Sequence, residues 1–549
     1  MIKFTNISLS LKKQAELNPY KRAVVYPNGR DKNGRVLYSQ ITFRQLDELS
    51  DSLAFGLESI GIIRGTRTIL MVTPGMEFFI TMFAMFKVGA VPVVVDPGMG
   101  INRMLQCLQE GRPKAFIGIE RAHLLRTLKP QFFKTVQHWV TVGNRWFWGG
   151  HTLDQLMTNP RKDFPKAHTT WDETAAIVFT TGSTGPAKGV VYTHGNFDAQ
   201  IRQIQAHFKI EPDEIDLPTF PLFAMFDPPL GMTAVIPDMD PTKPALVNPS
   251  KIIEAIENHG VTNMFASPAL LNRVGKYGKE NEIKLPSLRR VVSAGAPVSP
   301  ANIEQFSTML SEDAQIHTPY GATEAVPIIS IGSHEILSET KHLSEQGFGM
   351  CIGRPIQNTA IRLLKITDEP ITQLRETLMV PENQVGEIAV QADLVTKQYF
   401  NNREADLLSK IPDAGGTFWH RMGDLGWQDS KGRIWFCGRK SHRVNTGKEI
   451  LFTIPVEAIF NNHKKVFRSA LAGVGPKGHQ TPVIFIEPNS KITNKPAFIQ
   501  ELLALAKSNP LTSEIVHIFI EKNFPVDIRH NSKIFREQLA IKAAKKLKL

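Results

Sequence analysis

Cysteine is scarce in this sequence, and its placement excludes several classes of protein. The 549 residues include three cysteines, Cys107, Cys351 and Cys437, and none of them belongs to a C-x-x-C pair. Without such pairs the sequence predicts no disulfide framework, zinc ribbon or thioredoxin-like site. A reducing compartment suits a chain with so few thiols, so we expect a cytoplasmic protein.

Long apolar runs are also missing. The most apolar stretch, residues 68–96, is interrupted by Pro74, Glu77 and Lys87, whereas a membrane helix needs about 18 predominantly apolar residues in succession. Residues 1–17 contain lysines and a glutamate but no sustained apolar core of the kind found in a secretory signal. We therefore expect neither a transmembrane segment nor a cleaved signal.

Positive charge is in excess and unevenly placed. Residues 440–549 hold 18 Lys and Arg against 8 Asp and Glu, a net charge of +10, which leaves +2 for residues 1–439. A basic unit of this kind is compatible with nucleic acid, an anionic membrane or an anionic small molecule. No zinc-finger or helix-turn-helix spacing accompanies it, so a solvated basic face is the simpler interpretation and no nucleic-acid partner is expected. The change near residue 440 indicates a domain boundary.

The order of apolar segments predicts an α/β fold. Residues 68–72 and 91–95 read as buried strands on either side of an apolar helix over residues 76–86, and further strands are expected at residues 263–266 and 290–293. Strand–helix–strand units of this length are typical of βαβ layers with parallel sheets.

Later segments predict two smaller units. Short alternating strands after about residue 355 indicate a β-rich subdomain, and helices and strands mix again in the last 110 residues. We predict a large N-terminal domain over residues 1–438, with the β-rich subdomain at about 355–438, and a small α+β C-terminal domain over residues 439–549.

The segment with the clearest chemistry follows a predicted strand at residues 176–179. Residues 180–189 read T-T-G-S-T-G-P-A-K-G. Glycine lets a backbone approach its ligand, hydroxyls and amides donate hydrogen bonds, and lysine supplies charge, as a phosphate-binding loop requires. The segment is not a Walker A loop, because Ala187 rather than glycine precedes Lys188. The candidate ligands are Thr180, Thr181, Gly182, Ser183, Thr184, Gly185 and Lys188.

Five further motifs follow in order along the chain. They are Ser293-Ala294-Gly295-Ala296-Pro297, Tyr320-Gly321-Ala322-Thr323-Glu324, Trp419-His420-Arg421-Met422-Gly423-Asp424, Gly438-Arg439 and Asn531-Ser532-Lys533-Ile534. Together with the T-T-G-S-T-G-P-A-K-G loop, they resemble the AMP-forming, adenylate-producing ligases, which include acyl-CoA synthetases, peptide-synthetase adenylation domains and luciferases. The resemblance covers nearly the whole chain. It implies a mobile C-terminal lid domain and a reaction in which ATP and Mg²⁺ activate a carboxylate as its adenylate.

The resemblance implies three catalytic residues. Glu324 is the expected Mg²⁺ ligand, since this hard cation prefers oxygen, and Thr323 is expected to donate to the α-phosphate. Lys533 is expected to stabilise the charge that develops as pyrophosphate leaves.

Other residues are expected to hold the nucleoside. The Asp424 carboxylate suits the ribose hydroxyls, and the Arg439 guanidinium suits phosphate or ribose. Tyr320 offers a flat face to adenine. The expected residues around the base are Tyr320, Gly321, Gly295, Ala296 and Pro297.

The sequence departs from the family pattern at several positions. Met422 replaces a threonine, Ser441 occupies the hinge position where the family often has Asp or Lys, and Ala224 replaces an acyl-site histidine. Gly447 and Pro455 are eight residues apart, where the family has five. In CoA-using members this glycine segment lies against the pantetheine arm, so the expansion argues against CoA.

Three segments resemble one subgroup, the olefin β-lactone synthetases, which act on long-chain β-hydroxy acids. These segments are residues 220–232, 237–241 and 318–327. The implied reaction adenylates the carboxylate, and the substrate's own tethered β-hydroxyl then attacks the acyl carbon to give a β-lactone, AMP and pyrophosphate. The resemblance also implies an assembly with other olefin-pathway enzymes.

Alternatives remain open at this stage. The apolar residues 220–232 suit an alkyl-chain pocket, but such a run is as often buried core. A long-chain fatty acyl-CoA ligase or fatty acyl-AMP ligase would share the nucleotide residues. A non-catalytic nucleotide-binding scaffold would keep the fold alone.

Overall fold

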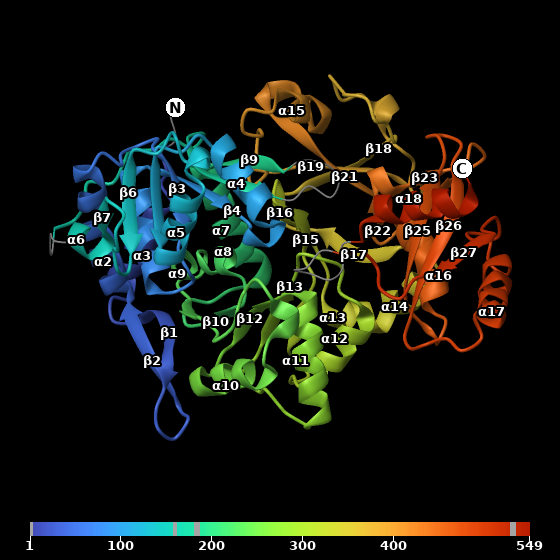
Figure 1. The fold of residues 1–549 in the computed structure, drawn as a ribbon, viewed down its shortest axis with the longest axis horizontal. Coiled ribbons are helices and arrows are strands. Elements are labelled where there is room, and N and C mark those ends of the chain that lie inside the picture. The colour runs from blue at the N-terminus through green and yellow to red at the C-terminus, as the bar shows by residue number, and fades with distance from the viewer. Residues whose placement is uncertain (1–3, 158–161, 181–186, 527–533, 549) are drawn as a thin grey trace.

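The computed structural model describes residues 4–157, 162–180, 187–526 and 534–548, and two seven-stranded sheets dominate it (Figure 1). The strands of the first sheet, in spatial order, are β7 (His151–Thr152), β6 (His138–Val142), β5 (Ala115–Ile119), β3 (Arg67–Met71), β4 (Val91–Val95), β8 (Thr174–Thr180) and β9 (Lys188–Thr193). Those of the second are β14 (Gln315–His317), β13 (Arg290–Ser293), β12 (Asn263–Ala266), β10 (Ile215–Pro218), β11 (Thr233–Val235), β1 (Arg22–Arg30) and β2 (Val36–Thr42). Each sheet is parallel except for its last strand, which closes an antiparallel hairpin. The predicted parallel βαβ layers are confirmed.

Helices fill the space between the two sheets and cover their outer faces. The inner helices are α2 (Phe43–Ser59), α3 (Met76–Val88) and α7 (His194–Phe208), whose apolar side chains share one core with both sheets. The outer helices are α4 (Ile101–Glu110) and α5 (Glu120–Leu128) on the first sheet, and α10 (Pro249–His259) and α11 (Pro268–Glu280) on the second. Helix α3 is buried from Phe78 to Val88, as expected of a helix enclosed on all sides. It ends at Gly89, whose φ of +74° is the left-handed conformation that glycine commonly adopts there.

An antiparallel sheet follows the second parallel sheet. Its strands are β15 (Tyr320–Ala322), β16 (Ala325–Ser330), β17 (Met350–Pro355), β22 (Ile434–Arg439), β21 (Phe418–Gln428), β19 (Gly386–Gln391) and β18 (Ala360–Leu364), with β20 (Lys410–Pro412) beside β21. Helix α15 (Arg403–Ser409) leads into β20. The sheet also includes β15, β16 and β17, which precede the predicted start of the β-rich subdomain at about residue 355. Strand β17 pairs with β22, and β16 and β15 follow it in spatial order.

The last part of the chain forms a small α+β unit with its own core. Its central strands are β25 (Val466–Val474), β26 (Thr481–Pro488) and β27 (His517–Ile520), which pack against α16 (Thr453–Asn461), α17 (Lys495–Lys507) and α18 (Arg536–Leu547). Figure 1 shows this unit in red at one end of the molecule. A large N-terminal and a small C-terminal unit are therefore present, whereas the boundary at residues 438 and 439 stays a prediction. In the part of the chain that the structure describes, no helix is both long enough and apolar enough to cross a bilayer.

Candidate nucleotide and acyl-adenylate site

The predicted phosphate loop connects β8 to β9. Thr180 and Lys188 are backbone partners at the end of this hairpin where the loop connects the two strands. This end lies at the carboxyl edge of the first sheet, where parallel α/β sheets bind their ligands. The other loop candidates, Thr181, Gly182, Ser183, Thr184 and Gly185, lie outside the described residues. Lys533 lies outside them as well.

Tyr399 brings Glu324 close to the base of this loop. Its hydroxyl donates to Glu324 Oε1 at 2.7 Å, and the ammonium of Lys188 lies 5.0 Å from the centre of the same ring. Burial, with the negative charge of Glu324 adding to it, raises the pKa of Tyr399 far above its ordinary value, so the hydroxyl stays protonated and can donate. Glu324 and Lys188 of the predicted phosphate loop therefore contact the same tyrosine, and the carboxylate oxygens of Glu324 would suit Mg²⁺.

The backbone around Glu324 is also fixed. Its carbonyl accepts hydrogen bonds from the N–H of Thr396 at 2.9 Å and from Thr396 Oγ1 at 3.2 Å. The carbonyl of Thr323 accepts a hydrogen bond from the Tyr192 hydroxyl. Because Tyr192 belongs to β9, the Thr323–Glu324 segment is tied directly to the strand that begins at Lys188.

Lys410 is a member of this cluster that the sequence motifs do not identify. Its ammonium donates to the carbonyl of Thr396 and lies 5.7 Å from the ring centre of Tyr399. Burial lowers the pKa of Lys410 to about 7, although the charges of Glu324 and Asp406 oppose that change. Neither Tyr399 nor Lys410 belongs to one of the sequence motifs. The pairing of β20 with β21 and the path of residues 396–400 bring them to Glu324, so the sequence alone carries no signal for them.

A second cluster joins Tyr320, Asp424 and Arg439. The Tyr320 hydroxyl donates to Asp424 Oδ2 at 2.6 Å, and Arg439 Nη1 lies 3.0 Å from Asp424 Oδ1. Asp424 and Arg439 are cross-strand partners on β21 and β22, whereas Tyr320 comes from β15. The carboxylate of Asp424 is thus oriented by two of the other residues that the sequence predicts for the nucleoside.

The charges of the two clusters interact. Burial raises the pKa of Asp424, while Arg439 and the hydrogen bond from Tyr320 oppose the increase. The pKa of Arg439 is raised mainly by Asp424, with Tyr320 and Glu324 adding to the effect. Arg439 therefore interacts electrostatically with both predicted carboxylate ligands.

The predicted adenine segment follows β13. Gly295 has φ of +93° in the loop that leaves this strand, and Ala296 and Pro297 continue the loop towards α12 (Pro300–Ser307). Strand β14 runs parallel to β13 and leads to Tyr320 and Gly321. Both segments thus leave the carboxyl edge of the second sheet, the edge at which a ligand is expected.

The apolar residues 220–232 are mostly core. Ala224, Met225 and Phe226 are buried between the two parallel sheets. Phe223 is half-buried and stacks on Phe265 of β12, with ring centres 4.4 Å apart. The alkyl-chain pocket stays a prediction, with the half-buried Phe223 as a candidate lining residue.

Ser441, the predicted hinge, is exposed in the 3-10 turn Lys440–His442. The expanded segment after Gly447 forms part of a tight hairpin of β23 (Val444–Asn445) and β24 (Ile450–Leu451). Gly447 has φ of +86°, and a Cβ there would lie 2.6 Å from His479 Nδ1. Gly447 thus lies close to His479, and residues 448–451 continue the hairpin.

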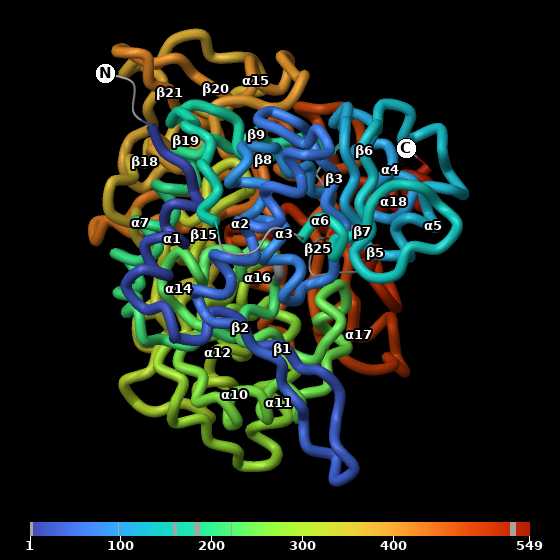
Figure 2. Tube along the Cα trace, turned by 90° about the vertical axis from the view of Figure 1, so that its left-hand side faces the viewer, coloured from blue at the N-terminus to red at the C-terminus, as the bar shows by residue number. Residues whose placement is uncertain are grey.

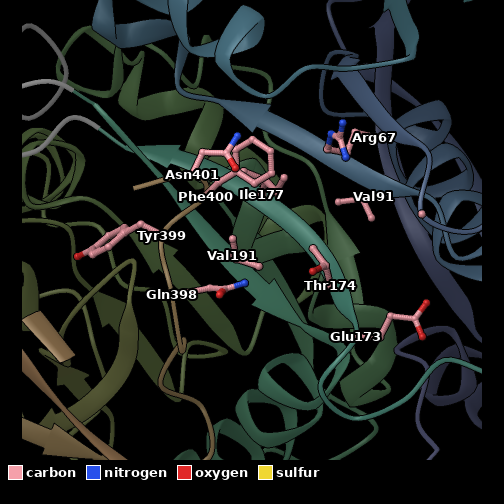
Figure 3. A pocket seen from close by; sticks show the side chains of 11 residues that line it. Arg67, Val91, Glu173, Thr174, Ile177, Val191, Gln398, Tyr399, Phe400 and Asn401 are labelled. Carbon is pink, nitrogen blue, oxygen red and sulfur yellow. The ribbon is translucent and has the colours of Figure 1, made fainter. Parts of the chain in front are cut away.

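A cavity of about 460 Å³ lies elsewhere, at the amino ends of β3 and β4 (Figure 3). Its lining includes Arg67, Val91, Glu173 and Phe400. Tyr399 also contributes, but its side chain points away from the others in Figure 3, and its hydroxyl binds Glu324. None of the predicted nucleotide ligands is among the described residues that line the cavity, so we do not assign it to the nucleotide.

Comparison with known proteins gives consistent results. The sequence matches the family described as AMP-binding enzyme over residues 11–400. It is 43% identical to the olefin beta-lactone synthetases of Stenotrophomonas maltophilia and Xanthomonas campestris pv. campestris, with 99% of this chain and 98% of each relative covered. The solved structure of o-succinylbenzoate CoA synthetase (MenE) from Bacillus subtilis with ATP and magnesium ion shares the fold. Its TM-score is 0.74 at 21% identity, over 96% of this chain and 98% of that chain.

Proposed function

The chain belongs to the AMP-binding enzyme family, and from this premise we propose that it is an AMP-forming ligase that converts a long-chain β-hydroxy acid into a β-lactone. The observation that carries the proposal is the 43% identity to olefin beta-lactone synthetases over 99% of the chain. Two clusters of side chains support the proposal, Lys188–Tyr399–Glu324 and Tyr320–Asp424–Arg439. They bring together the residue types that a bound nucleoside triphosphate requires.

In the proposed first step, a carboxylate oxygen of the acid attacks the α-phosphorus of ATP. The bond between the α- and β-phosphates breaks, and pyrophosphate leaves with the electron pair. Lys188 and the hydrogen-bond donors of the phosphate loop would hold the phosphates. Lys533 would stabilise the negative charge that develops as pyrophosphate leaves. Glu324 would hold Mg²⁺, which when bound neutralises phosphate charge.

In the proposed second step, the β-hydroxyl oxygen attacks the acyl carbon of the adenylate. The bond between that carbon and the phosphate oxygen breaks, AMP leaves, and the hydroxyl proton passes to solvent. A hydroxyl tethered to the acyl group has a large effective concentration. Because the four-membered ring is strained, the site must also limit hydrolysis by water.

The nucleoside would bind between the two parallel-sheet edges. Tyr320 and the segment Gly295, Ala296 and Pro297 would flank adenine, while Asp424 and Arg439 would meet the ribose. Since Tyr320 and Arg439 already orient the Asp424 carboxylate, a nucleoside would meet a preformed set of partners. A cytoplasmic location and an assembly with other olefin-pathway enzymes stay predictions.

One incubation tests the proposed reaction. The protein is given a racemic long-chain β-hydroxy acid, ATP and Mg²⁺, with and without CoA, and lactone, acyl-CoA and AMP are quantified by mass spectrometry. We expect lactone and AMP in equal amounts, unaffected by CoA. A fatty acid of the same length without the hydroxyl is the matched control, and it should give no lactone.

Two results would contradict the proposal, and each would support a different alternative. Acyl-CoA as the main product, with little turnover when CoA is left out, would indicate an acyl-CoA ligase. An absence of AMP with every acid tested, despite nucleotide binding, would indicate a scaffold.

A further inference from the structure

Positive charge collects in one segment at an end of the first sheet. Residues 112–151 contain seven Lys and Arg and a single Glu, a net charge of +6, whereas the rest of residues 1–439 has a net charge of −4. The segment comprises β5, α5, β6 and the loop of residues 143–150, which lie together at one margin of the molecule in Figure 2. The proposed reaction uses none of these residues.

The same segment exposes large apolar side chains. Trp146 is 57% exposed and Phe147 is 76% exposed in the loop, and Leu128 is 68% exposed on α5. Leu124, one helical turn before Leu128, is also exposed. Exposed Arg121 and Arg145 accompany these apolar groups on the same two elements.

The loop is held firmly against α5. Trp148 is buried and stacks on His123, with ring centres 5.5 Å apart, and its Nε1 donates to Thr141 Oγ1 at 3.1 Å. The backbone N–H of Asn144 donates to Glu120 Oε1 at 2.9 Å. Because these contacts fix both ends of the Arg145–Trp148 stretch, Trp146 and Phe147 project from a defined surface.

We propose that this surface, formed by α5 and the loop of residues 143–150, binds an anionic phospholipid membrane. Tryptophan is enriched where proteins meet the headgroup layer, and large apolar side chains such as phenylalanine and leucine insert beneath it. Neighbouring Lys and Arg are attracted to anionic lipids. We favour a membrane over a protein partner because the charge of residues 112–151 is almost entirely of one sign, seven Lys and Arg against one Glu, as attraction to an anionic lipid surface requires.

The position of the surface relates membrane binding to the proposed reaction. Strand β6 leaves the sheet for this loop at the same carboxyl edge at which β8 reaches Thr180. Strands β5, β3 and β4 separate the two, a distance of about 20 Å at the usual strand spacing. If the substrate is a long-chain acid, as the proposed function holds, docking here would bring the reaction edge near its lipid source.

Vesicle sedimentation tests the proposal without any substrate. The full-length protein is mixed with vesicles of phosphatidylcholine alone or of an equimolar mixture with phosphatidylglycerol, at low and high salt. We expect binding to the anionic vesicles that weakens with salt. The double variant W146S/F147S should lower the partition coefficient on the order of tenfold, since both side chains are exposed and their loss leaves the core intact.

The matched control is Y20S/F467S, which removes two exposed aromatic side chains elsewhere and should bind vesicles like the unaltered protein. Equal vesicle binding by W146S/F147S and the unaltered protein would overturn the proposal and point to the basic C-terminal unit. Absence of vesicle binding would also overturn it, and self-association lost in W146S/F147S would then identify a protein-docking face. Lactone formation from the long-chain β-hydroxy acid without vesicles, measured in parallel, reports on the proposed function separately.

Discussion

Tyr399 gives three charged side chains a common partner. Its hydroxyl binds Glu324, and the ammonium groups of Lys188 and Lys410 lie 5.0 and 5.7 Å from its ring centre. Cations near an aromatic ring are attracted to its electron-rich face. A single neutral residue thus contacts a carboxylate and two lysines near the point where β9 begins.

Lys533→Ala tests the predicted catalytic lysine. Because this residue would act on developing charge, its loss should lower kcat on the order of 10²-fold or more while the protein stays folded. The measurement is pyrophosphate release. Lys545→Ala removes an exposed lysine of α18 as the matched control, and pyrophosphate release by Lys533→Ala at the rate of that control would refute the assignment.

Glu324→Gln tests the predicted metal ligand. An amide is a poor ligand for a hard dication, so the variant should need far more Mg²⁺ and lose at least tenfold in rate at low Mg²⁺. The Mg²⁺ dependence of ATP use measures this effect. Tyr399→Phe keeps the carboxylate but removes its 2.7 Å hydrogen bond, and we expect an intermediate result. Normal turnover of Glu324→Gln at low Mg²⁺ would contradict the role.

Lys410→Met tests the lowered pKa of Lys410 through stability. The folded protein loses this proton near pH 7, whereas the unfolded chain keeps it to about pH 10.4. Between these values the unfolded state binds more protons, so Lys410 makes the free energy of unfolding rise with pH. We expect a rise of about 2 kcal/mol from pH 7 to pH 9 that is absent in Lys410→Met.

Urea unfolding of both proteins at the two pH values measures the difference. Lys32→Met, at an exposed position in the turn between β1 and β2, should keep the rise. Identical pH dependence in Lys410→Met and the unaltered protein would show that Lys410 stays charged.

Helix α7 links the β8–β9 hairpin to the antiparallel sheet. Thr193 Oγ1 accepts a hydrogen bond from the backbone N–H of Asn196 at 3.1 Å, and Asn196 Oδ1 accepts one from the backbone N–H of Thr193 at 3.0 Å. These two hydrogen bonds form a reciprocal helix cap at the end of β9. Asn196 Nδ2 also donates to the carbonyls of Asp393 and Val395, at 2.9 and 3.2 Å. The cap therefore fixes the start of the helix and the path that leads to Thr396 and Tyr399.

Thr193→Ala removes the side-chain half of this cap. We expect the free energy of unfolding to fall by about 1 kcal/mol, the usual cost of losing an N-cap hydroxyl. Chemical denaturation measures it. Thr135→Ala, in an exposed turn, is the control and should change stability by less than about 0.5 kcal/mol. Equal stability of the two variants would mean that the cap contributes nothing.

Across the whole molecule, buried charge joins the large and small units. Glu387 is buried on β19 and lies 2.6 Å from Arg421 Nη2 and 2.9 Å from Lys440 Nζ, just before the predicted hinge at Ser441. Beyond the hinge, Arg443 Nη2 lies 2.7 Å from Asp368 Oδ2. The pairs Glu387–Lys440 and Asp368–Arg443 connect the large unit to the start of the C-terminal unit, whereas Glu387 and Arg421 both belong to the large unit.

Glu387→Gln leaves Arg421 buried with a weakened partner. We expect a loss of about 3 kcal/mol in stability and faster proteolysis near residue 440, since breaking a buried ion pair on one side is costly. Thermal unfolding and limited proteolysis measure the two effects. Glu376→Gln breaks the exposed pair with Arg362 and should cost less than about 1 kcal/mol. A Glu387→Gln protein as stable as Glu376→Gln would contradict this account.

Local pattern was enough to predict many elements of the fold. The expected strands at residues 91–95, 263–266 and 290–293 coincide with β4, β12 and β13, because short apolar runs are a local property of the sequence. The ordered motifs likewise predicted the ligase family, which the comparisons confirm. The site residues among them stay predictions, although the structure brings Tyr320, Asp424 and Arg439 together.

Only the tertiary structure decided which side chains meet. Tyr320 and Asp424 are 104 positions apart, and Glu324 and Tyr399 are 75 apart, so no local pattern reports their hydrogen bonds. Lys410 carries no motif, and its lowered pKa arises from burial that exists only after β20 pairs with β21. The apolar residues 224–226 could have lined a pocket or a core, and the packing of two sheets made them core. Sequence determines which groups are available and where strands begin, whereas burial, pairing and charge environment are properties of surfaces that form when distant segments pack.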